Sequence, residues 1–196
     1  MKKGLIVLIA VAAVLLGIFF WFQGTYNNMV KMDEGVQAAW SQVENVYQRR
    51  ADLIPNLVAT VKGYAAHEQQ TLEGVISARS KATQITVNAE DLTSEQLAKY
   101  QQAQGELGSA LGKLLAITEN YPDLKANTNF LELQSQLEGT ENRIAVERKK
   151  FNDAARAYNT TIRQFPKNIV AAMFGFEKKP YFEAQEGAEQ APKVEF

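Results

Sequence analysis

An unbroken apolar stretch near the N-terminus constrains this chain more than any other feature of its sequence. Residues Gly4 to Phe22 read GLIVLIAVAAVLLGIFFWF and contain no charged or strongly polar side chain. As a helix rising about 1.5 Å per residue, this stretch is just long enough to cross a hydrocarbon core of about 30 Å. We therefore expect a transmembrane helix, whose anchoring side chains include Leu5, Ile6, Leu8, Leu15, Ile18, Phe19 and Trp21.

A cleaved signal peptide is the competing interpretation of the same stretch. Signal peptides usually have an apolar core of about 7–15 residues, followed by small residues at the cleavage site. Here the apolar run is longer and it leaves through the bulky sequence FFWFQG. The sequence therefore favours an uncleaved anchor over residues 1–24.

Basic residues near the span indicate its orientation. Lys2 and Lys3 precede it, whereas Lys31 is the only Lys or Arg in the twenty residues that follow. Because cytoplasmic flanks carry the excess of basic residues, we expect a cytoplasmic N-terminus. The rest of the chain then lies on the outer side of the membrane.

Two rows of residues at heptad spacing follow the span and predict a long helix. One row consists of Met29, Val36, Val43, Arg50, Leu57 and Tyr64, and the other of Asp33, Trp40, Tyr47, Ile54 and Val61. Two such rows form a seam that must face other helices. The first row begins seven residues after Phe22 with no Pro-rich or Ser-rich linker, so the span is expected to continue into this helix as a stiff stalk. At Pro55 we expect a kink or the first turn of a restarted helix.

Start and stop signals predict three further helices. The second helix is expected over 66–88, and the third begins where Thr93 and Gln96 have capping-box spacing, continuing to Tyr121 and Pro122. Gly105, Gly108 and Gly112 lie on nearly one face of the third helix and predict close approach of a neighbour there. The fourth helix is predicted from a cap near Asn129, with Glu132 three residues on, to Pro166. Its apolar row recurs every seven residues: Phe130, Leu137, Ile144, Phe151, Tyr158 and Phe165.

These elements predict an all-α protein in which a single transmembrane helix continues into an elongated antiparallel four-helix bundle over 25–166. Residues 167–196 hold the apolar sequence NIVAAMFGF and, after Lys179, a polar stretch that we expect to be a mobile tail. The fourth helix returns toward the membrane, so the apolar segment is expected beside the bilayer. It either packs on its own bundle or contacts lipid or a neighbouring protomer. The residues concerned are Ile169, Val170, Met173, Phe174 and Phe176.

Several long blocks of sequence resemble the LemA family. They are RRADLIPNLVATVKGYAAHE at 49–68, ALGKLLAITENYPDLKANTNFLELQSQLEGTENRI at 110–144 and YNTTIRQFP at 158–166, followed by FGF at 174–176 and YFEA at 181–184. The resemblance covers essentially the whole chain. It implies a bacterial membrane-anchored helical bundle and supplies no chemistry.

Charged residues on the packing faces predict a polar layer inside the bundle. Arg50 and Asp33 occupy seam positions, and Glu141 lies one step from the seam of the fourth helix. A buried charge is costly unless it is paired, so we expect Arg50 to pair with Glu141, with Asn56 and Glu119 as further members. Such a layer either fixes helix register, which the sequence favours, or forms a ligand or relay site.

No catalytic constellation is present in the sequence, and a non-enzymatic protein is expected. The chain has no cysteine, which excludes disulfides, thiolate chemistry and lipoprotein-type acylation, and His67 is its only histidine. No HExxH, GxSxG or phosphate-binding loop occurs, so no cofactor, metal or small-molecule ligand is predicted. The net charge of −1 argues against nucleic acid. The expected partners are the lipid bilayer, further copies of the chain or other envelope proteins.

The sequence therefore supports two functional hypotheses. The preferred one is a membrane-tethered, self-associating scaffold of the bacterial envelope. The alternative is a ligand-sensing or signalling module, or an accessory subunit of a membrane enzyme such as a protease, with the polar layer as its switch.

Overall fold

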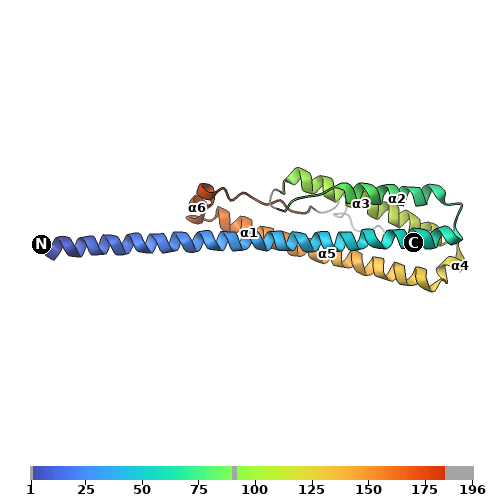
Figure 1. The fold of residues 1–196 in the computed structure, drawn as a ribbon, viewed down its shortest axis with the longest axis horizontal. Coiled ribbons are helices and arrows are strands. Elements are labelled where there is room, and N and C mark those ends of the chain that lie inside the picture. The colour runs from blue at the N-terminus through green and yellow to red at the C-terminus, as the bar shows by residue number, and fades with distance from the viewer. Residues whose placement is uncertain (1, 90–91, 184–196) are drawn as a thin grey trace, which may run out of the picture.

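The structure, a computed structural model, describes residues 2–89 and 92–183, and this part of the chain is helical without strands. Six helices follow one another: α1 (Lys2–Tyr64), α2 (Gln69–Gln84), α3 (Ser94–Thr118), α4 (Pro122–Lys125), α5 (Thr128–Arg163) and α6 (Lys167–Phe174). Figure 1 shows α1 as the axis of an elongated molecule, with its N-terminal third standing clear of all other elements.

The apolar stretch and the first heptad helix form one continuous helix, as the sequence predicts. α1 runs for 63 residues without a break. It is the one helix among the described residues that is long and apolar enough to cross a membrane. The seven predicted anchor residues are all exposed on it, and the first buried residue is Thr25. Residues 3–21 are all exposed, and Phe22, which packs against Phe174 of α6, is the first half-buried residue.

Packing of α1 against α5 forms the centre of the domain. α1 and α5 lie side by side over most of the length of the domain. α2 packs on α1, and α3 packs on α2. Both predicted rows of α1 are buried except at Asp33 and Tyr64, and the predicted row of α5 is buried as far as Tyr158. The last member of the predicted row, Phe165, lies beyond the end of α5 and is 81% exposed. Heptad spacing thus identified the buried faces of both long helices.

Several predicted helix ends are corrected by the structure. The second helix, expected over 66–88, is only Gln69–Gln84, and the β-branched sequence ITV at 85–87 that follows it is not helical. The capping box of α3 is present as predicted, because Thr93 Oγ1 accepts from the Gln96 amide and Gln96 Oε1 accepts from the Thr93 amide. The cap of α5 is Asn127 instead of Asn129, since Asn127 Oδ1 accepts from the Phe130 amide at 3.0 Å.

Sequence reasoning missed the two short helices. Pro122, read as a stop signal, also occupies the first turn of α4, where a missing N–H costs nothing. α6 forms from the apolar segment after Pro166 and ends at Gly175, whose φ of 71° lies in the left-handed region that glycine adopts freely. α6 packs against α1 and α5.

Pro55 lies inside α1 and leaves a defect that a neighbouring helix repairs. Proline has no N–H, so the carbonyl of Ala51, four residues earlier, lacks its helical donor. Arg79 of α2 supplies one, with its Nε at 2.7 Å from Ala51 O. Because Ala51 is buried, this bond both satisfies the carbonyl and attaches α2 to α1.

We predict that the Arg79 bond matters only because of the proline. Arg79→Met should lower the free energy of unfolding by about 1–3 kcal/mol, the usual loss for a charged hydrogen-bond donor. In a Pro55→Ala background the new amide donates to Ala51, and the same change should cost much less. Urea denaturation of the four proteins of this double-mutant cycle measures the difference. An equal loss in both backgrounds would contradict the assignment.

Candidate functional site

A polar layer centred on Arg50 divides the buried core of the domain into two parts. The cluster nearer the apolar stretch of α1 includes Trp40, Tyr47 and Phe151, and the distal cluster includes Ile54 and Leu107. Arg50 comes between them on α1, where the heptad pattern requires an apolar residue, and it is only 2% exposed. A buried guanidinium needs acceptors, and it takes them from the two facing helices.

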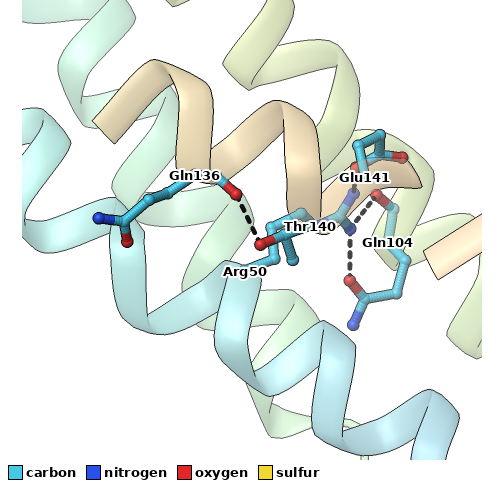
Figure 2. Close-up of polar contacts among 5 residues, drawn as sticks. All are labelled: Arg50, Gln104, Gln136, Thr140 and Glu141. Carbon is cyan, nitrogen blue, oxygen red and sulfur yellow. Dashed lines mark hydrogen bonds and ion pairs between the residues drawn. The ribbon is translucent and has the colours of Figure 1, made fainter. Parts of the chain in front are cut away.

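Three hydrogen bonds hold the Arg50 guanidinium (Figure 2). Nη1 donates to Glu141 Oε2 of α5 at 2.9 Å. Nη2 donates to the main-chain oxygen of Gln104 on α3 at 3.0 Å and to its side-chain Oε1 at 2.6 Å. Nε has no hydrogen-bond partner within the part of the chain that the structure describes. The arrangement ties α1, α3 and α5 together at one level.

Two tyrosines beside the Arg50 guanidinium, Tyr47 and Tyr100, have phenol groups that stay protonated. The Tyr47 ring lies with its centroid 5.1 Å from Arg50 Cζ and packs edge-on against Tyr100. Burial raises the pKa of the Tyr47 phenol, an effect that the positive charges of Arg148 and Arg50 reduce. Burial also raises the pKa of Tyr100, helped by nearby Tyr47 and Glu44. At neutral pH both phenols are therefore uncharged and neither acts as a base.

A groove runs along the polar layer between α3 and α5. It has a volume of about 440 Å³, within the range of ligand-sized clefts, and its lining includes Arg50, Gln104, Glu141 and Arg148. The three glycines predicted to permit close helix approach also line it. A Cβ at Gly105 or Gly112 would meet no atom within 4 Å, and one at Gly108 would lie 3.9 Å from Arg50 Nη1. The glycine face therefore borders an open groove, and the predicted close contact is wrong.

The segment that follows α6 packs between α3 and α5 at the end of the domain nearer the apolar stretch of α1. Phe182 stacks on Trp40 and meets Phe151 edge-on, and it is buried. Lys179 is buried as well and pairs through Nζ with Asp33 Oδ1 at 3.0 Å. The tail predicted to be mobile after Lys179 is therefore packed as far as Glu183, and its remaining residues, 184–196, lie outside the described residues.

Two asparagines of α5 bind the main chain of this segment. Asn159 accepts from the Lys179 amide at 2.9 Å and donates to its carbonyl at 2.8 Å. Asn152, seven residues earlier, accepts from the Phe182 amide at 2.9 Å and donates to its carbonyl at 3.0 Å. Each side-chain amide thus pairs with an extended chain as a neighbouring strand would.

The structure brings together only some of the predicted site residues. Arg50 and Glu141 meet as expected, but Asn56 and Glu119 are exposed and lie outside the layer, with Glu119 paired to Lys125. Gln104 takes their place. The sequence held a signal for the burial of Gln104, because this polar residue occurs at helical spacing among the apolar residues Tyr100, Leu107 and Leu111. A functional role for the residues of the predicted polar layer stays a prediction.

The apolar segment after Pro166 has two faces, one packed on its own domain and one exposed, and contact of the exposed face with lipid or a neighbouring protomer stays a prediction. Val170 is buried and Phe176 half-buried against the domain, whereas Ile169, Met173 and Phe174 are at least half exposed. The Phe174 ring also contacts Phe22 and Tyr26, where the apolar stretch of α1 ends.

The remaining polar residues can be examined for the side-chain clusters that bind metal ions. Within residues 2–89 and 92–183, no three His, Asp or Glu side chains gather as a metal-ligand set would. His67 is exposed in the turn between α1 and α2.

Comparison with known proteins identifies relatives over most of the chain. The LemA family profile matches residues 39–196. The magnetosome proteins MamQ 1 and MamQ 2 of Paramagnetospirillum magneticum are 31% identical over 175 residues, which is 81% of this chain and 64% of each relative. Protein LemA of Metamycoplasma hominis is 28% identical over 172 residues, 87% of this chain and 75% of that protein. The chain thus spans 64% of the length of the MamQ proteins that it matches.

We predict that Glu141, whose partner Arg50 is buried, stabilises the fold more than an acid whose partner is exposed. Glu141→Ala removes the counter-ion of the buried Arg50 guanidinium. The loss in the free energy of unfolding should be about 1–2 kcal/mol, because the Glu141 side chain is itself 59% exposed to screening water and Arg50 keeps its two bonds to Gln104. Glu95→Ala, which breaks the exposed Lys99 pair on α3, is the matched control and should change little. Chemical denaturation compares the two. Equal and small effects would show that the layer does not depend on the ion pair.

Proposed function

We propose that this chain, which belongs to the LemA family, is a membrane-tethered, non-enzymatic scaffold that self-associates or holds partner proteins at the bacterial envelope. The observation that carries the proposal is the unbroken α1. Its exposed apolar third is long enough to span a bilayer, and the same helix forms the core of the domain. Tether and domain are one helix, so the domain is held at a fixed angle to its anchor.

The comparisons support this proposal in a limited way. The relatives carry the names of a family and of the magnetosome, and neither name states a reaction. The antiparallel four-helix bundle expected over 25–166 belongs to the proposal too, with α1, α2, α3 and α5 as its members. Long helical faces of this kind offer docking surface to other helices.

Bilayer contact through α6 is a second part of the proposal. Phe174 packs on Phe22 and Tyr26, so α6 lies at the level where the apolar stretch of α1 ends. Its outward side chains include Ile169 and Met173. Apolar groups at that level suit the interface between headgroups and acyl chains, where the exposed Lys178 has access to headgroup phosphates.

The orientation follows from the positive-inside rule and completes the proposal. Lys2 and Lys3 lie before the span and Lys31 after it, which supports a cytoplasmic N-terminus in the inner membrane and a domain on the outer side.

The ligand-sensing or accessory-subunit alternative is supported by one observation, the groove beside the Arg50 layer. A buried cation at the floor of an open groove is a means of recognising a polar ligand. A small molecule that copurifies with the protein and is lost from Arg50→Met would favour this alternative over the scaffold.

We predict that the detergent-solubilised full-length protein has a mass above that of one chain or carries other envelope proteins. Light scattering coupled to size exclusion gives the mass of the protein component, and mass spectrometry identifies what copurifies. A clean monomer without partners would contradict the scaffold proposal.

We predict that Met173 of α6 contacts lipid. The chain has no cysteine, so Met173→Cys accepts a single environment-sensitive fluorophore in the full-length protein. In lipid vesicles its emission should shift to the blue and be quenched by nitroxide-labelled lipid. Leu131→Cys, at the far end of the domain and similarly exposed, is the control and should remain in an aqueous environment. Identical spectra at both sites would rule out the bilayer contact.

A further inference from the structure

Among the residues that the structure describes, one half of the cleft between α3 and α5 is occupied and the other half is open. Its membrane-proximal half holds residues 179–183, which bury Phe182 and pair their main chain with Asn152 and Asn159. Its distal half is the groove over Arg50. The two halves meet at Gln101 and Arg148.

The junction between the halves lies at Glu183. Its carbonyl accepts one hydrogen bond from Gln101 Nε2 of α3 at 2.9 Å and another from Arg148 Nη2 of α5 at 3.1 Å. The same two side chains line the groove. The main chain therefore arrives at the mouth of the groove, held by a donor from each wall.

We propose that the groove is the binding site for the next residues of the same chain, about 184–190. The segment before Glu183 already shows how this cleft recognises extended main chain, through side-chain amides on its walls. The groove continues with polar side chains of the same kind, Gln104 and Ser109 among them. Main-chain hydrogen bonds give such a site affinity, with little demand on sequence.

The dimensions agree with this occupant. From Gln101 to Leu115 the α3 wall is 14 residues long, about 21 Å at the helical rise. An extended chain covers that distance in about six or seven residues. Ala184, Gly187 and Ala188 are small, which suits a groove whose wall has glycines at Gly105, Gly108 and Gly112.

Attachment also favours this segment over a free peptide. Residues 184–190 follow directly from a clamped residue, and a short tether gives an effective concentration in the millimolar range. A separate peptide of equal intrinsic affinity must exceed that concentration to compete. The proposal does not depend on self-association or on bilayer contact.

Disulfide mapping in the full-length, detergent-solubilised protein tests the proposal, because the chain has no cysteine of its own. Gly105→Cys is paired with Gln185→Cys, and Gly112→Cys with Ala188→Cys, since a side chain at either glycine meets nothing within 4 Å. Each pair should form an intramolecular disulfide, which requires Cβ atoms about 3.5–4.5 Å apart. Gly139→Cys, about 160° around α5 from Glu141 by helical periodicity, is the control partner.

The expected yield for the matched pairs exceeds that of the Gly139→Cys controls by about tenfold, as tethered neighbours require. Equal yields with the groove and control positions would overturn the proposal. Disulfide-linked dimers in place of intramolecular bonds would overturn it too, because they would assign the groove to a second copy.

If a double-cysteine variant fails to fold, the rate at which a single cysteine reacts with a maleimide tests the same proposal. Gly112→Cys should react with a maleimide more slowly in the full chain than in a chain ending at Glu183. Gly139→Cys should react at the same rate in both. Equal rates for Gly112→Cys would show that the groove is not covered, and the proposal would fail.

Discussion

Two helices, α1 and α5, bury their apolar rows against each other over most of the domain, and the other elements attach to that pair. Trp40 and Phe151 show the strength of the seam, since both are almost fully buried and such side chains contribute about 1.5–3 kcal/mol each. α5 depends on this surface because most of the stability of a protein helix comes from the packing of its apolar face and not from its helical propensity. The seam also fixes where α6 lies, at the point where α5 ends and the apolar part of α1 begins.

Each polar interruption of the α1 seam positions one of the attached elements. Asp33 pairs with Lys179 and holds the segment after α6, Arg50 binds Gln104 of α3, and the proline defect at Ala51 receives Arg79 of α2. A purely apolar seam leaves neighbouring helices free to slide by a turn. A buried charge or an unpaired carbonyl does not, because only one register satisfies it. The polar positions of α1 therefore fix where the attached elements pack along the helix.

Sequence periodicity predicted the long elements well because their information is local. The rows ending in Val61 and Tyr158, the continuity of α1 and the Thr93 cap all follow from spacing within one helix. Contacts between distant segments were harder. Asn152 and Asn159 read as ordinary polar positions until Phe182 is known to lie beside them, and Glu119 was as plausible a partner for Arg50 as Gln104. Gly105 and Gly112 were ambiguous in principle, since a missing side chain permits either a close neighbour or an empty groove.

The continuity of α1 makes the domain a lever. About 42 residues separate Phe22 from Tyr64, so in the proposed membrane-spanning arrangement the distal end lies about 63 Å beyond the membrane surface. A transmembrane helix adjusts its tilt when the bilayer is thicker or thinner than its apolar length, and a tilt of about 20° is ordinary. With no hinge between span and domain, that tilt displaces the far tip sideways by about 20 Å. In that arrangement the hydrocarbon thickness influences the position of α4 at the opposite end of the molecule.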